Sequence, residues 1–269
     1  MGRMIAGYGA SHTAMMIRRY DPTAADQRRI REAFETLRAE VDELAPDVVV
    51  IVSSEHLNSF FYDNYPQVCV GIGDTCTGLG DAGVPAAEVP LATGFASALL
   101  DAGAARGFDL SWSADPRLDH GFMAPLTLIR PGLDLPIVPI FQNASTPPLA
   151  PFWRSAQLGE LIASVVAERP EGERVLLLAA GGLSHWVGTP GMGRVNVEFD
   201  EGFLDCVRRG AVGELLTWDV PWVTETAGNG AQEIRNWVTV MAACPSPGTV
   251  TAYEPVTEWA TGMALARLF

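Results

Sequence analysis

One stretch decides the fold class: RVLLLAAGGLSHWVG, residues 174–188. Its first seven residues are almost wholly apolar, which is typical of a strand buried on both faces of a parallel sheet. Two glycines, a leucine and a serine then lead to a histidine. Glycine lets a chain turn tightly and approach other groups closely. We therefore expect this loop to aim the His185 imidazole into a site at the end of the strand.

Similar apolar runs recur along the chain and alternate with segments of helical periodicity. Between the first two runs, Ile30, Phe34, Leu37, Val41 and Leu44 repeat every three or four residues, as on one face of a helix. The alternation favours an α/β fold with a central, largely parallel sheet flanked by helices and an active site at the strand carboxyl ends. The length favours a single domain over residues 1–269. The expected strands are 3–9, 47–53, 67–72, 108–113, 136–141 and 174–180, and the further expected helices are 88–106, 155–168, 198–216 and 230–243.

Charge and composition exclude several classes of function. The chain has 18 basic residues, all of them arginine, against 32 acidic residues, and its net charge is −14. Such a field repels phosphate backbones, so we expect no nucleic-acid partner. The absence of lysine excludes Schiff-base chemistry. No apolar run has the length of a membrane span, and the N-terminus has no signal-peptide core, so we expect a cytoplasmic protein without a membrane partner.

The chain contains only four histidines: His12, His56, His120 and His185. Each lies in or just beyond the loop after an expected strand, and none lies on an expected helix. Ligands of α/β sheets bind beyond the carboxyl ends of the strands. We therefore expect the four imidazoles to share one site. The alternative is four unrelated histidines, each with its own local hydrogen bonds.

Glu233 lies in AGNGAQEIRNWVTVMAA (227–243), where a Gly-Asn-Gly turn should begin a helix with one apolar face. Its position at the edge of that face predicts a partly buried carboxylate, which needs a compensating cation or donor. Arg235 should point away from Glu233, so a metal ion is the sharper explanation. Two histidines and one carboxylate suit non-haem Fe(II). The same set suits catalytic Zn(II), and residue types leave that choice open.

Aromatic residues follow His56 in the segment SSEHLNSFFYDNY (53–65). Aromatic side chains in a loop beside a ligand suit the wall of a pocket for a flat substrate. A hydrophobic plug under the loop is the alternative. The candidate substrate-contacting residues of the chain are Asn58, Phe60, Tyr62, Trp186 and Thr257.

Seven motifs carry a resemblance to a known family. They are GASH (9–12), SSEHLNSFFYDNYP (53–66), LDHGF (118–122), GGLSHW (181–186), NVEFDEGFLD (196–205), AGNGAQEIRNW (227–237) and YEPVTEW (253–259). In this order, and over nearly the whole chain, they resemble the class III extradiol ring-cleaving dioxygenases. This family includes the protocatechuate 4,5-dioxygenase β subunits and the 2,3-dihydroxyphenylpropionate 1,2-dioxygenases.

The resemblance implies a role for each candidate residue. His12, His56 and Glu233 would be the ligands of Fe(II), His185 the catalytic acid and base, and His120 a second catalytic histidine. The substrates would be a small aromatic diol and dioxygen, and the product a muconic semialdehyde. The resemblance also implies a homo-oligomer and leaves open a small separate α subunit.

The chain departs from the family pattern at two positions, and other functions stay open. Gln232 stands where some relatives have histidine, and Trp186 where glutamine is common. Arg194, Arg235 and Thr257 are unranked anchors for a substrate carboxylate. The alternatives to catechol cleavage are a zinc-dependent hydrolase, a non-catalytic binding protein on the same fold, and a dioxygenase for an aminophenol or a methylated gallate.

Overall fold

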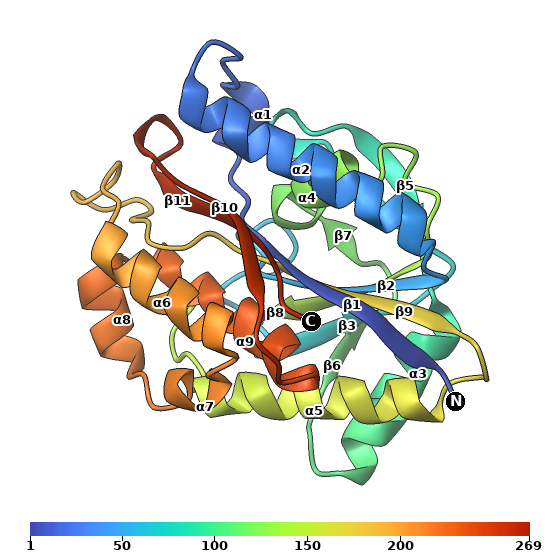
Figure 1. Ribbon diagram of the computed structural model, residues 1–269. Helices are drawn as coiled ribbons and strands as arrows, with labels where there is room; N and C mark the ends of the chain where they lie inside the picture. Colours follow the sequence, from blue (N-terminus) through green and yellow to red (C-terminus); the bar gives the residue numbers. More distant parts are fainter.

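The computed structural model describes all of residues 1–269 and is built around an eight-stranded sheet (Figure 1). The strand order is β10-β11-β1-β9-β2-β8-β3-β6, and the four central strands β1, β9, β2 and β8 are parallel. The α/β fold with a largely parallel sheet is therefore confirmed. The strands of this sheet are β1 (Arg3–Ala10), β2 (Val48–Ser53), β3 (Val68–Gly71), β6 (Ser111–Ser113), β8 (Ile137–Gln142), β9 (Arg174–Ala180), β10 (Thr249–Val256) and β11 (Thr261–Arg267).

Helices cover both faces of the sheet, and this explains why its central strands are apolar throughout. In β9, Val175 and Leu177 pack into the core on the side of α5 and α9, whereas Leu176 and Leu178 pack into the core on the side of α2 and α4. Each buried side chain of this size contributes about 1.5–3 kcal/mol to folding. The helices are α1 (Met15–Arg18), α2 (Ala25–Leu44), α3 (Thr93–Ala105), α4 (His120–Ile129), α5 (Phe152–Glu168), α6 (Val197–Arg209), α7 (Val212–Leu215), α8 (Val220–Ala227) and α9 (Ile234–Ala243).

A second, three-stranded sheet lies on the side of α2 and α4. Its order is β5-β4-β7, with strands β4 (Thr75–Leu79), β5 (Ala86–Pro90) and β7 (Arg117–Leu118). The short 3₁₀ helix η1 (Asp81–Gly83) joins β4 to β5. Two further 3₁₀ helices, η2 (Gly230–Glu233) and η3 (Thr257–Trp259), lie near the C-terminus. The sequence did not predict this small sheet because its strands are short and carry few apolar residues.

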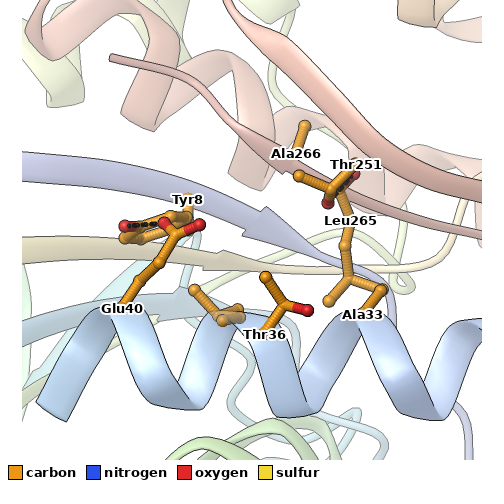
Figure 2. A pocket seen from close by; sticks show the side chains of 8 residues that line it. Tyr8, Ala33, Thr36, Glu40, Thr251, Leu265 and Ala266 are labelled. Atoms are coloured by element: carbon orange, nitrogen blue, oxygen red, sulfur yellow. Dashed lines mark hydrogen bonds between the residues drawn. The ribbon is translucent and has the colours of Figure 1, made fainter.

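Helix α2 packs on the sheet as the periodicity predicts, with Ile30, Phe34, Leu37 and Val41 buried. Its neighbour on β1 is Tyr8, whose hydroxyl donates a hydrogen bond to Glu40 Oε2 at 2.6 Å. Figure 2 shows this pair beside a small pocket between α2 and the strands. The pocket has a volume of about 10 Å³, which is room for one water molecule and not for an aromatic substrate.

Several predicted element boundaries are wrong. The strand predicted at 108–113 is only Ser111–Ser113, and the first residues of the helix predicted at 88–106 belong to β5. The helix predicted at 198–216 is two helices, because Gly210 ends α6 in a left-handed conformation (φ 65°). The hairpin of β10 and β11 and the helix α8 were not predicted. No helix combines the length and the hydrophobicity that a bilayer-spanning segment needs.

Candidate metal centre

Three neighbouring parallel strands end in segments that carry a candidate histidine. His12 follows β1, His56 follows β2, and His185 follows β9, which lies between β1 and β2. His120 does not lie in a loop, as the sequence predicted, but is the first residue of α4. The prediction missed this helix because Pro125 lies inside it. Glu233 is the last residue of η2 and lies at the start of α9.

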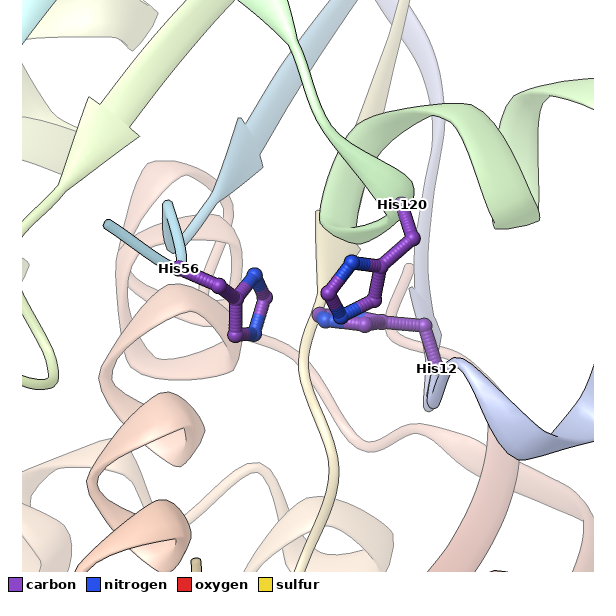
Figure 3. Close-up of side chains that lie close together, drawn as sticks. All are labelled: His12, His56 and His120. Atoms are coloured by element: carbon purple, nitrogen blue, oxygen red, sulfur yellow. The ribbon is translucent and has the colours of Figure 1, made fainter. Parts of the chain in front are cut away.

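The imidazoles of His12, His56 and His120 lie in direct contact (Figure 3). The ring centroids of His56 and His120 are 4.3 Å apart and stacked, and the His12 ring lies edge-on at 5.3 Å and 6.0 Å from them. One ring nitrogen from each of the three lies within 4.8 Å of the others. Three nitrogen donors thus converge from β1, β2 and the small sheet.

The Glu233 carboxylate joins this cluster. Its Oε1 lies 3.1 Å from His56 Nε2 and 3.8 Å from His12 Nε2, and its Oε2 accepts a hydrogen bond from the Gly182 N–H at 2.7 Å. Two ligand atoms about 2.1 Å from one ion lie roughly 3.0 Å apart at a right angle. Two imidazole nitrogens and a carboxylate oxygen therefore fit a divalent metal ion at this position.

A second carboxylate orients His56. Asp119 Oδ2 accepts hydrogen bonds from the His56 backbone N–H at 2.7 Å and from its Nδ1 at 3.0 Å. The other oxygen, Oδ1, caps α4 by accepting from the Gly121 N–H at 2.9 Å. This arrangement leaves Nε2 of His56 facing Glu233, as in carboxylate–histidine–metal sites. His12 differs, because its Nδ1 is buried and has no hydrogen-bond partner.

The electrostatics of the cluster favour a cation. Burial lowers the pKa of His12 to about 3 despite the nearby Glu233, so this ring is neutral and keeps a lone pair. Burial alone would raise the pKa of Glu233, but the surrounding imidazoles lower it to about 2. Burial would lower the pKa of His56, but Asp119 and Glu233 outweigh burial and raise it. The carboxylates therefore stabilise positive charge here, which either a proton or a metal ion can supply.

The loop after β9 holds His185 in one orientation. Nδ1 of His185 lies 2.8 Å from the Leu183 carbonyl, which can only accept, so Nδ1 donates this hydrogen bond. Added Cβ atoms at Gly182 and Gly230 would lie only 3.0 Å and 2.6 Å from His185 Cε1. Glycine is thus required here because the imidazole occupies the space of a side chain. The His185 ring lies near enough to lower the pKa of Glu233, but it is not part of the three-ring cluster.

Two further carboxylates lie behind these histidines and, like Asp119, were not among the predicted site residues. Asp81 Oδ2 lies 2.6 Å from His120 Nδ1. Asp200, which is wholly buried, accepts hydrogen bonds from the Ser184 N–H at 2.7 Å, from Ser184 Oγ at 2.9 Å and from the Tyr253 hydroxyl at 2.8 Å. Burial raises the pKa of Asp200 to about 6, and these hydrogen bonds offset only part of that effect. The sequence signal for Asp200 was its place in NVEFDEGFLD (196–205).

The predicted substrate contacts of the loop after β2 lie in different environments. The Asn58 side-chain amide donates to the His56 carbonyl at 3.3 Å and to Asp119 Oδ2 at 3.2 Å. The Phe60 ring packs edge-on against Phe141 with a centroid distance of 5.5 Å. Tyr62 is 80% exposed. Asn58 thus helps to fix the His56 loop, and a substrate contact for any of the three stays a prediction.

The remaining candidates lie on other segments. Trp186 follows His185 and stacks with the Arg194 guanidinium, whose Cζ lies 4.6 Å from the ring centroid. Thr257 is exposed at the start of η3. Arg235 is buried and donates its hydrogen bonds to Gln232 and to the Ala150 carbonyl, away from the histidine cluster. Of the two candidate cationic anchors, only Arg194 therefore lies on the loop that carries His185.

The chain is similar to known proteins over almost its whole length. A family described as "Catalytic LigB subunit of aromatic ring-opening dioxygenase" matches residues 6–264. Proteins named 2,3-dihydroxyphenylpropionate/2,3-dihydroxicinnamic acid 1,2-dioxygenase are similar over most of the chain. The protein from Photorhabdus laumondii is 32% identical over 95% of this chain and 94% of its own length, and that from Burkholderia vietnamiensis is 30% identical over 90% of each.

A solved structure shares the fold. The crystal structure of an uncharacterized protein from Escherichia coli K12 superposes with a TM-score of 0.62 and covers 98% of this chain and 99% of its own. Its sequence identity is 16%, so this likeness concerns the fold alone.

Proposed function

The chain belongs to the family of catalytic LigB subunits of aromatic ring-opening dioxygenases, and on this premise we propose that residues 1–269 form one catalytic domain for extradiol cleavage of a catechol-type ring. The observation that carries the proposal is the approach of Glu233 Oε1 to Nε2 of both His56 and His12. In this reaction the ring opens beside its two hydroxyls, and both atoms of dioxygen enter a muconic semialdehyde product.

His12, His56 and Glu233 are the residues that we assign to hold Fe(II). Fe(II), when bound, supplies one centre at which a catechol and dioxygen are oriented together and exchange electrons. A set of three imidazoles, with His120 in place of Glu233, is the alternative. We favour Glu233 because its Oε1 lies 3.1 Å from Nε2 of His56, and because a carboxylate ligand offsets part of the ion's charge.

His185 and His120 are the residues that we assign to proton transfer and substrate binding. Because Nδ1 of His185 bonds to the Leu183 carbonyl, Nε2 is the free base that would accept a proton from a substrate hydroxyl and return it later. His120 presents Nε2 to the cluster, because its Nδ1 is engaged by Asp81. A hydrogen bond from His120 to a substrate oxygen would stabilise charge that develops there.

The names of the relatives favour a catechol that carries a short carboxylate side chain as the substrate. Arg194, stacked on Trp186 beside the catalytic loop, supports this choice because it is the one candidate cation on that loop. We further propose that the enzyme acts as a homo-oligomer in the cytoplasm. A small α subunit stays a prediction.

The test is anaerobic loading with Fe(II), followed by oxygen uptake with 2,3-dihydroxyphenylpropionate, protocatechuate, 2-aminophenol and 3-O-methylgallate. We expect uptake and a yellow ring-fission chromophore, strongest with the first substrate. No uptake with any of them, together with hydrolysis by the zinc-loaded protein, would refute the dioxygenase. Binding of the panel without turnover would instead indicate a non-catalytic protein.

A matched pair of variants separates metal binding from proton transfer. His12→Ala should lose bound iron and all turnover. His185→Ala should retain iron and substrate binding but lower turnover by roughly 100-fold or more, the usual scale for loss of a general base. A His185→Ala enzyme that stays fully active across pH would contradict the assigned role.

A further inference from the structure

Asp81 lies outside every motif that pointed to the site, yet it makes a short contact with the cluster. Its Oδ2 lies 2.6 Å from Nδ1 of His120. Both side chains are largely buried, with 23% of Asp81 and 15% of His120 exposed. A carboxylate at this distance accepts the Nδ1 proton in a charge-assisted hydrogen bond, which is about twice as strong as a neutral one.

The register of the small sheet places these two residues side by side. Strands β4 and β7 are parallel, with Thr77 opposite Arg117 and Gly78 opposite Leu118. Parallel neighbours leave the sheet at the same edge, so η1 after β4 and α4 after β7 begin next to each other. Asp81 is the first residue of η1, and His120 is the first residue of α4.

The turn that presents Asp81 is conformationally costly. Gly80, Ala82 and Gly83 all have positive φ angles, of 72°, 54° and 86°. Alanine is rare in this region, and its presence there costs about 1–2 kcal/mol. The turn packs against α1, where a Cβ at Gly83 would lie 3.0 Å from Arg18 Cγ. Surrounding contacts thus maintain a strained turn whose first side chain reaches the cluster.

We propose that Asp81 is a positioning residue that holds His120 in one orientation and one tautomer, with the proton on Nδ1 and Nε2 directed into the site. The inference rests on the proposed function, because it assigns His120 its task in that reaction. Neutral imidazole has one donor and one acceptor nitrogen, so fixing the donor fixes the acceptor. Without Asp81, His120 is free to carry its proton on either nitrogen.

Asp119, the residue just before His120 in the chain, performs the same task for His56. Asp119 holds Nδ1 of His56 at 3.0 Å, while Asp81 holds Nδ1 of His120 at 2.6 Å. The two imidazoles stack with their centroids 4.3 Å apart. The junction of β7 and α4 therefore supplies Asp119 and His120, and the turn after β4 supplies Asp81.

The direct test is the tautomer of His120, measured by nitrogen-15 NMR of histidine-labelled protein loaded with diamagnetic zinc. The chain has only four histidines, so a His120→Gln variant assigns the signal. We expect one tautomer, protonated on Nδ1, in the unmodified protein. Asp81→Asn and Asp81→Ala should give a mixture or the reversed tautomer. The control is Asp74→Asn, which removes an exposed carboxylate just before β4.

The same variants, loaded with Fe(II), should lower kcat by about 10–100-fold with little change in KM or iron content. The control should change neither the tautomer nor kcat. The proposal is overturned if the Asp81 variants keep the original tautomer, whatever their activity, or if they change it and keep full kcat. If the unmodified enzyme cleaves no substrate, the proposed function fails, and the tautomer alone decides whether Asp81 positions His120.

Discussion

Gly230→Ala is the sharpest test of where the His185 imidazole lies. A Cβ at this position would overlap the His185 ring, with Nε2 and Cδ2 as the closest atoms and Cε1 at 2.6 Å, whereas carbon atoms in contact are about 3.5 Å apart. The ring must therefore retreat by at least about 1 Å. The hydrogen bonds from Gly230 N–H to the His185 carbonyl (3.1 Å) and from Nδ1 to the Leu183 carbonyl (2.8 Å) oppose that shift.

A displacement of this size has a predictable effect on rate. Moving a catalytic group by about 1 Å costs on the order of 100-fold, or about 2.7 kcal/mol in the activation free energy. We expect that loss in kcat for Gly230→Ala, measured by oxygen uptake with the iron-loaded enzyme. Iron content must be measured alongside, because Gly230 and Glu233 belong to the same 3₁₀ helix.

The matched control is Gly202→Ala in α6, where an added Cβ meets no atom within 4 Å. It should retain full activity and gain about 0.5–1 kcal/mol in stability, because alanine favours helix over glycine. A double-mutant cycle completes the test. In a His185→Ala background, Gly230→Ala should cause no further loss, because the ring it displaces is absent. An equal loss in both backgrounds, or wild-type kcat for Gly230→Ala alone, would refute the reasoning.

Two further predictions concern the buried carboxylates. Asp119→Asn should weaken iron binding by about 10–100-fold, because His56 loses the carboxylate that orients it. Competition with a chelator measures this affinity. An unchanged affinity would show that the Asp119–His56 pair is not needed for iron binding. Asp200→Asn should abolish a pH dependence of stability. Because the pKa of Asp200 is raised to about 6 in the folded state, the native protein holds a proton that the unfolded chain has released. The free energy of unfolding of the parent protein therefore falls as pH rises from about 4 to 6. Urea unfolding should show the variant gaining up to about 3 kcal/mol relative to the parent between pH 4 and 7, and a flat difference would mean an ordinary pKa.

The sequence predicted the central sheet because burial on both faces leaves an unmistakable pattern. Strands such as RVLLLAA (174–180) pack apolar side chains into two cores, so they stand out against the helices around them. The same logic placed His12, His56 and His185, because residues just beyond neighbouring parallel strands meet at one edge. Glu233 was found from its position beside an apolar helix face, where an unpaired carboxylate is costly.

The small sheet and its carboxylates could not be predicted in this way. Strand β7 has only two residues, Arg117–Leu118, which is too short for any periodicity. Asp81 and Asp119 resemble ordinary turn and helix-capping residues, and both do lie at such positions. Only the three-dimensional pairing of β4 with β7 reveals that their side chains reach two histidines. Because α4 begins only two residues after β7 ends, no loop long enough to hold His120 lies between them, and its placement in a loop was wrong.

The two sheets supply different parts of the site: the large sheet positions three of the histidines, and the small sheet positions His120 and the carboxylates Asp81 and Asp119. Strand-end loops of the large sheet bring His12, His56 and His185 together, but a loop alone leaves a free imidazole two tautomers. Nδ1 of His56 is bound by the Asp119 carboxylate and Nδ1 of His120 by the Asp81 carboxylate, so Nε2 is the nitrogen that remains available in both rings. His185 reaches the same state with the Leu183 carbonyl, a neutral acceptor. His185 thus keeps Nε2 available without a carboxylate of its own, and this is the nitrogen to which we assign proton transfer.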